Sequence, residues 1–96
     1  LETMIKRISM WRLQDSAEAT NMKELLLTMD GQDSSLQSIE VGINTSSHKS
    51  AYDIVFIGTF LNKEAIMEFE NDSFHKSVGV VVGSLKQERV VVEYEF

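Results

Sequence analysis

The chain contains 96 residues, of which 43% are hydrophobic and 25% are charged, and it carries a net charge of −6 at pH 7. This length and composition correspond to one globular domain. Because nucleic acids and anionic membrane surfaces attract clustered Lys and Arg, the negative charge argues against both as partners. The sequence contains no cysteine, which excludes disulfides and thiolate chemistry.

Two features predict where the domain begins and where the protein resides. Leu1, Glu2 and Thr3 precede Met4, and we expect these three residues to be a cloning remnant and residues 4–96 to form a single domain. No apolar run approaches the roughly 20 residues that a membrane helix needs, and the N-terminus lacks a signal-peptide pattern. The sequence therefore predicts a cytoplasmic protein.

The first predicted elements are a strand over residues 4–13 and a helix that follows it. Apolar side chains lie on both faces of this strand: Ile5, Trp11 and Leu13 on one, Met4, Ile8 and Met10 on the other. Asp15 and Glu18 have the spacing of a helix-capping box, and Gly31 is a typical left-handed stop. Between them, one apolar stripe predicts the buried face of the helix: Ala19, Met22, Leu25, Leu26 and Met29.

The remaining predicted elements are three strands and a second helical segment. Alternating apolar residues predict strands over residues 36–44, 52–60 and 88–96. Asn62 is a good helix N-cap, and a break is expected near Asp72. Residues 73–85 include VGVVVG, which has strand propensity, but their apolar residues recur at offsets of 4, 7, 8 and 11. This spacing favours a helix that continues after the break.

This order of elements predicts an α+β domain with a ferredoxin-like βαββαβ arrangement, in which helices cover one face of a four-stranded antiparallel sheet. The opposite face should then be polar, yet it retains five apolar residues: Ile8, Met10, Val55, Ile57 and Val91. Two such sheets packed face to face would bury these side chains. We therefore expect a homodimer.

The chain resembles the stress-responsive A/B barrel (Dabb) domain family. The resemblance extends from Met4 to Tyr94 and rests on the segments MIKRISMWRL, IEVGIN, YDIVFIGTF, EAIMEFENDSFHKSV and ERVVVEYEF in this order. It implies a dimeric α+β barrel, in which the sheets of two subunits form the barrel and the helices lie outside. Members of the family include stress-associated proteins and a polyketide cyclase, and the wider group includes cofactor-free monooxygenases. The fold alone therefore implies no single reaction.

The resemblance singles out His75 as the candidate catalytic residue. His75 corresponds to the second histidine of the family's His-Pro-x-His stretch, which acts as a general base in the cyclase-like members; the first histidine is Asp72 here. The tyrosine that partners this histidine in the cyclase is Phe69, and the histidine of the first strand is Arg7. These departures remove the partner groups of the cyclase. The structural alternative is a histidine that binds the backbone at a helix end.

Four further residues are candidates for a ligand pocket: Arg7, Trp11, Tyr52 and Phe69. Arg7 would need an anionic partner if it pointed between the sheet and the helices, whereas a strand arginine usually pairs with a neighbouring carboxylate such as Glu93. The aromatic residues are more often simply core. Asp72 and His75 are too few ligands for a metal site, and no Gly-rich phosphate loop is present. The sequence therefore predicts no metal and no cofactor.

Two hypotheses about function follow. The first is a small dimeric Dabb-type protein, stress-related or binding a small apolar or aromatic ligand, without a defined catalytic constellation. The second is a small enzyme, cyclase-like or monooxygenase-like, that acts on an aromatic compound in a cavity beside His75. The size of the cavity beside His75 distinguishes them, because an apolar pocket of about 300 Å³ or more would favour an enzyme, whereas a filled core would exclude it.

Overall fold

The computed structural model describes residues 3–32 and 34–96. Leu1 and Glu2, which belong to the expected cloning remnant, lie outside the described residues. The elements follow the order β1 (Ile5–Leu13), η1 (Ser16–Glu18), α1 (Ala19–Leu27), β2 (Leu36–Ile43), β3 (Ile54–Phe60), α2 (Lys63–Asn71), α3 (Ser73–Leu85) and β4 (Lys86–Glu95). Within this part of the chain, no helix is long and apolar enough to span a membrane.

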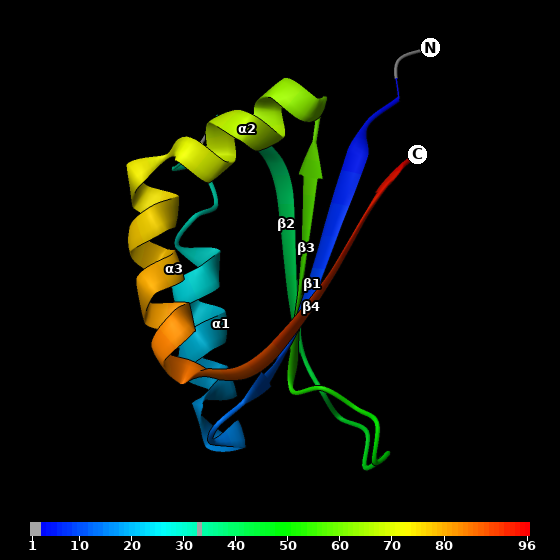
Figure 1. Ribbon diagram of the computed structural model, residues 1–96, viewed down its shortest axis with the longest axis vertical. Helices are drawn as coiled ribbons and strands as arrows, with labels where there is room; N and C mark the ends of the chain where they lie inside the picture. Colours follow the sequence, from blue (N-terminus) through cyan, green and yellow to red (C-terminus); the bar gives the residue numbers. More distant parts are fainter. Residues whose placement is uncertain (1–2, 33) are drawn as a thin grey trace.

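The four strands form one antiparallel sheet in the order β2-β3-β1-β4, and the helices lie together on one of its faces (Figure 1). This arrangement confirms the predicted α+β, ferredoxin-like fold. The helix on either side of Asp72 is also confirmed, since α2 ends at Asn71 and α3 begins at Ser73.

One of the two predicted helix caps is found as expected, and the other begins a different element. The Asn62 side chain accepts a hydrogen bond from the Ala65 backbone N–H at 2.9 Å, which confirms the cap of α2. Asp15 accepts from the Ala17 N–H, but this cap begins η1 rather than α1. The predicted capping box is wrong, because the Glu18 carboxylate accepts from the Asn21 side chain instead.

The helices pack on some strands of the sheet more closely than on others. Helices α1 and α2 pack on β2 and β3, whereas α3 packs mainly on α1 and α2. The buried core accordingly lies over β2, β3 and the inner side of β1, and its largest fully buried side chains include Phe60, Phe69 and Met22. Strand β4 is exposed along its whole length.

The face of the sheet away from the helices is more apolar than the sequence suggested. Residues opposite one another in antiparallel register point to the same side, so Val92 shares this face with Ile8, and Val90 shares it with Met10. Val91 is paired with Ser9 and points to the helix side, so its predicted place on the open face is wrong. The prediction failed because the main apolar residues of β4, Val90, Val92 and Tyr94, point to the open face and not to the helices. The open face contains Ile8, Met10, Val55, Ile57, Val90, Val92 and Tyr94.

Candidate functional site

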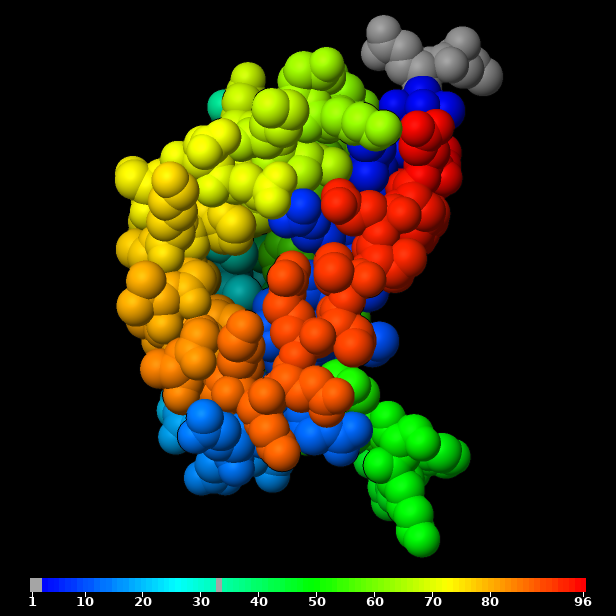
Figure 2. Space-filling view, in the orientation of Figure 1, coloured from blue at the N-terminus to red at the C-terminus, as the bar shows by residue number. Residues whose placement is uncertain are grey.

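A cavity of about 260 Å³ lies beneath α3, above β1 and β4. Figure 2 shows the hollow between the yellow and orange surface of α3 and the red surface of β4. It forms here because α3 rests on the other helices and not on this half of the sheet. Its lining comes from every layer of the fold: Arg7, Ser9, Trp11, Leu26, Met29, Phe56, Phe69, Glu70, His75, Val78, Gly79, Val82, Gly83, Lys86 and Arg89.

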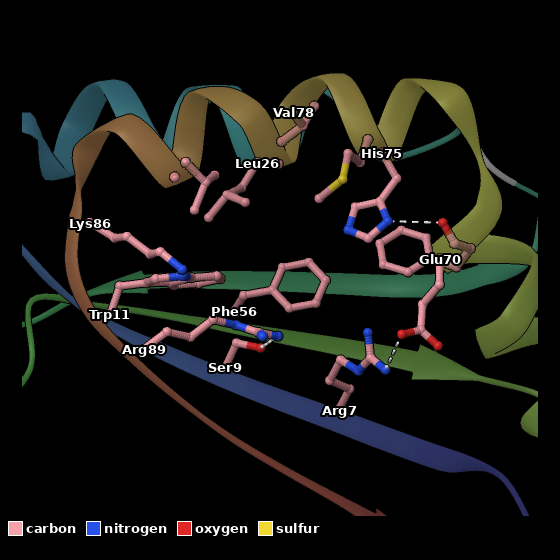
Figure 3. A pocket seen from close by; sticks show the side chains of 15 residues that line it. Arg7, Ser9, Trp11, Leu26, Phe56, Glu70, His75, Val78, Lys86 and Arg89 are labelled. Atoms are coloured by element: carbon pink, nitrogen blue, oxygen red, sulfur yellow. Dashed lines mark hydrogen bonds and ion pairs between the residues drawn. The ribbon is translucent and has the colours of Figure 1, made fainter.

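His75 is held in the first turn of α3 by three contacts. The Asp72 carboxylate caps the helix by accepting the His75 backbone N–H at 2.9 Å. The imidazole stacks on the Phe69 ring at a centroid distance of 3.8 Å, and its Nδ1 lies 2.9 Å from the Phe69 carbonyl oxygen. Since a carbonyl only accepts, Nδ1 carries the proton, and the neutral ring has its lone pair on Nε2. Figure 3 shows the His75 ring directed from α3 towards the cavity.

Arg7 reaches from β1 into the space between the sheet and the helices (Figure 3). Its Nη2 lies 3.4 Å from a Glu93 carboxylate oxygen and 3.5 Å from a Glu70 carboxylate oxygen. The cross-strand pair with Glu93 agrees with the structural alternative for this arginine. The Arg7 side chain is only 12% exposed, and its Nε is buried without a hydrogen-bond partner among the described residues.

Trp11 and Arg89 form the other polar part of the lining. Trp11 is 5% exposed, and its indole Nε1 is the second buried donor without an acceptor in the described part of the chain. Arg89 donates from Nη2 to the buried Ser9 hydroxyl at 3.0 Å, and its guanidinium lies 5.9 Å from the Trp11 ring centroid. Burial lowers the pKa of Arg89 from its ordinary value, and the positive charge of Arg7 lowers it further.

Two glycines keep the α3 side of the cavity open. Gly79 lies four residues after His75 and Gly83 four residues after Gly79, so the three positions are about one helical turn apart on one side of α3. A glycine inside a helix costs about 1 kcal/mol relative to alanine. A Cβ at either position would meet no atom within 4 Å, so close packing does not require these glycines. Their lack of side chains leaves space in the cavity instead.

The structure brings four of the five sequence-predicted site residues to this one cavity: Arg7, Trp11, Phe69 and His75. Tyr52 lies elsewhere, before β3, where the Arg12 guanidinium lies 4.6 Å from its ring centroid. Sequence reasoning missed Arg89 and Lys86, whose place beside β1 depends on the register of β4. The successive four-residue spacings from His75 to Gly79 and from Gly79 to Gly83 were a signal that could have been used.

Asp72 and Asp53 each accept a backbone N–H group. Asp72 caps α3, and Asp53 accepts the Leu13 backbone N–H at 2.7 Å. In residues 3–32 and 34–96, no three side chains from His, Cys, Asp or Glu come together to hold a metal.

A second hollow, of about 470 Å³, lies outside this cavity, between α2 and the end of β4. Its lining includes Ile66, Met67 and Tyr94 but neither histidine nor either of the buried donors described above. The cavity beneath α3 is therefore the better candidate site.

The sheet order and helix placement define a ferredoxin-like α+β domain with a cavity between its two layers. The model of the stress responsive A/B barrel domain (Dabb) matches residues 5–96. The chain therefore belongs to the Dabb family. No curated protein matches this chain.

Solved structures show the same fold. A dimeric protein of unknown function from Bacteroides fragilis NCTC 9343 is 25% identical, with a TM-score of 0.84 over 97% of this chain and 96% of that chain. A dimeric ferredoxin-like protein of unknown function from Thermobifida fusca YX is 13% identical, with a TM-score of 0.87 over 99% and 92%. A hydroxynitrile lyase from Passiflora edulis is 9% identical, with a TM-score of 0.86 over 100% and 95%.

The two histidines of the chain should show opposite tautomers. His75 donates from Nδ1 to the Phe69 carbonyl, whereas the His48 Nδ1 accepts the Ser50 backbone N–H at 3.1 Å. We expect ¹⁵N chemical shifts at alkaline pH to report a protonated Nδ1 for His75 and a protonated Nε2 for His48. A protonated Nε2 on neutral His75 would contradict the geometry of the site.

Proposed function

We propose that this protein is a homodimeric small-molecule-binding member of the Dabb family, acting in the stress-related context that the family description gives. The ligand occupies the cavity beneath α3, and a second copy covers the open face of the sheet. The observation that carries the binding role is the cavity itself, which is lined by aromatic residues, by buried donors and by two helix glycines whose only evident effect is to keep it open.

The size and lining of the cavity favour a small ligand. Its volume of about 260 Å³ lies just below the roughly 300–1,000 Å³ of drug-sized pockets, so it suits a compact molecule with a single ring or a short chain. The deeper wall is apolar and includes Leu26, Met29, Phe56 and Val82. This combination agrees with an apolar or aromatic ligand body.

Filling the cavity from α3 should abolish ligand binding without unfolding the protein. Trp11 is the single tryptophan of the chain and lines the cavity, so its fluorescence reports occupancy. We expect 3-phenylpropanamide to change this fluorescence saturably, and the double variant Gly79→Leu/Gly83→Leu to lose the response. Each substitution should also add about 0.5–1 kcal/mol to the free energy of unfolding, because leucine favours helices over glycine.

The matched control is Val80→Leu, because Val80 lies on the outer side of α3 and is 76% exposed. This variant should bind the amide like the wild type. If the double variant kept the wild-type response, or if folded wild-type protein responded neither to the amide nor to the corresponding acid, 3-phenylpropionate, the binding role of the cavity would be excluded.

The apolar side chains on the open face of the sheet support the proposed dimer. Seven apolar side chains lie on this face, and Val92, near its middle, is 54% exposed. Burying each such side chain contributes about 1.5–3 kcal/mol, which favours a second copy over water as the neighbour of this face. The relatives from Bacteroides fragilis and Thermobifida fusca are described as dimeric, which supports the same arrangement here.

A charge at the centre of the open face should separate the subunits. We expect Val92→Lys to shift the mass measured by light scattering from twice 10.9 kDa to 10.9 kDa, since the ammonium would otherwise be buried against its own copy. Val80→Lys places the same charge on α3 and should leave the dimer intact. A wild-type mass of 10.9 kDa at all concentrations would exclude the dimer.

A second candidate function is catalysis with His75 as a general base. The specific observation is the hydrogen bond from Nδ1 to the Phe69 carbonyl, which leaves the lone pair of the neutral ring on Nε2. Such a base removes a proton from an acidic C–H or O–H group of a bound aromatic compound. The similar fold of the hydroxynitrile lyase supports only that this scaffold accommodates an enzyme.

Deuterium exchange tests this candidate independently of any known substrate. If His75 is a base, the wild-type protein should accelerate deuterium uptake at the methylene group of phenylacetone by about 10²-fold or more over His75→Gln. The substitution His48→Gln is the control and should have no effect. Equal rates for the wild type and His75→Gln would exclude a role for His75 as the base in this reaction.

A further inference from the structure

The charge of the cavity is opposite to that of the whole chain. The protein has 15 acidic and nine basic side chains and a net charge of −6. Among the described lining residues, by contrast, Arg7, Lys86 and Arg89 are basic and Glu70 alone is acidic. A local excess of positive charge in a hollow with apolar walls attracts anions, because field lines concentrate where water is scarce.

The existing ion pairs leave this positive charge only partly balanced. The two carboxylates near Arg7 both approach the same nitrogen, Nη2, at 3.4 and 3.5 Å. The side chains of Glu70 and Glu93 are 53% and 40% exposed, so water screens their attraction. Arg89 has a neutral partner, the Ser9 hydroxyl. The lowered pKa of Arg89 agrees with this surplus, since burial and the nearby Arg7 both disfavour its charge.

Two buried donors around the same cavity also lack acceptors. Arg7 Nε and Trp11 Nε1 belong to side chains that are 12% and 5% exposed, and neither has a hydrogen-bond partner in the part of the chain that the structure describes. An unsatisfied buried donor is costly, and native proteins rarely keep one without a reason. Both residues line the cavity, so an acceptor group bound there is the natural partner.

The chemistry of these donors selects the kind of acceptor. A guanidinium presents its N–H groups as a planar fork that matches the two oxygens of a carboxylate. An indole N–H adds a further donor but no charge. The apolar wall opposite, with Leu26, Met29 and Val82, suits a hydrocarbon or aromatic body rather than a second charge.

We infer that the ligand of this cavity is a small apolar monocarboxylate, whose carboxylate binds Arg7 and Trp11 with support from Arg89, and whose apolar body lies against α1 and α3. This inference rests on the proposed function, because it names the ligand class of the same cavity. The acid occupies the side of the cavity formed by β1 and β4 (Figure 3). Its charge balances the two arginines in place of water.

The test compares 3-phenylpropionate with 3-phenylpropanamide, which have nearly the same shape but differ in charge. Titration is followed by Trp11 fluorescence. We expect the wild type to bind the acid at least about tenfold more tightly than the amide, since hydrogen bonds to an ionised acceptor are roughly twice as strong as neutral ones. Added salt should weaken binding of the acid and leave the amide unaffected.

Substitution of single arginines shows which side chains cause the preference for the acid over the amide. Arg7→Gln should bring the affinity ratio of acid to amide close to one, and Arg89→Gln should reduce it. Arg12→Gln is the matched control, because Arg12 lies on the opposite face of the sheet, hydrogen-bonded to Glu88 at 3.2 Å. This control should keep the wild-type ratio. If Arg7→Gln fails to fold, Arg89→Gln decides the question.

The outcomes separate this inference from the proposed function. Equal binding of acid and amide by the wild type would overturn the carboxylate assignment while leaving a ligand-binding cavity. Binding of neither compound by folded protein would overturn both. A ratio that falls equally in Arg12→Gln and Arg89→Gln would show non-specific attraction and would also overturn the assignment.

Discussion

The structure depends on one constraint, which is that the helices cover only half of one face of the sheet. Helices α1 and α2 pack on β2 and β3, while α3 rests on the other two helices and leaves a cavity above the half of the face formed by β1 and β4. The hydrophobic core therefore ends beside β1, and the cavity begins there. All the described helices lie on this side of the sheet, and the other face of the sheet retains apolar side chains from β1, β3 and β4. Core, cavity and open face thus follow from the same incomplete cover.

Strand β1 contributes residues both to the cavity and to the open face of the sheet. Its helix-side residues, Arg7 and Trp11, carry buried donors that have no acceptor within residues 3–32 and 34–96, and its opposite residues, Ile8 and Met10, belong to the open face. Burying a donor without a partner costs about 1–3 kcal/mol, and exposing an apolar face forgoes a comparable gain for each side chain. A bound carboxylate would accept hydrogen bonds from the buried donors, and a second subunit would bury the apolar face. The proposed ligand and the proposed dimer are thus separate solutions on opposite sides of one strand.

Much of the fold could be predicted because local signals agree with the final packing. Asn62 caps α2 as expected, the helix breaks at Asp72 as expected, and the apolar spacing of residues 73–85 identified α3 despite the strand propensity of VGVVVG. The errors have physical causes. Glu18 has the spacing of a capping box, but the intervening turn is η1. Val91 points to the helix side because the register of β4 against β1 places its larger apolar set outwards.

The site was only partly predictable, because part of its lining depends on strand register and not on local sequence. The family resemblance pointed to His75, Phe69 and Arg7, which line one cavity. Of the two aromatic residues proposed for a ligand pocket, Trp11 lines the same cavity and Tyr52 lies beside Arg12 instead. Arg89 and Lys86 enter the lining through pairing between β1 and β4, a long-range contact that no local pattern specifies.

Native mass spectrometry of the wild type and of Val92→Lys with 3-phenylpropionate tests most directly whether ligand binding on one face of the sheet and dimer formation on the other are independent. We expect a wild-type species at twice 10.9 kDa with two bound acids, and a Val92→Lys species at 10.9 kDa with one. A folded Val92→Lys monomer that binds no acid, or a wild type that stays at 10.9 kDa, would contradict this expectation.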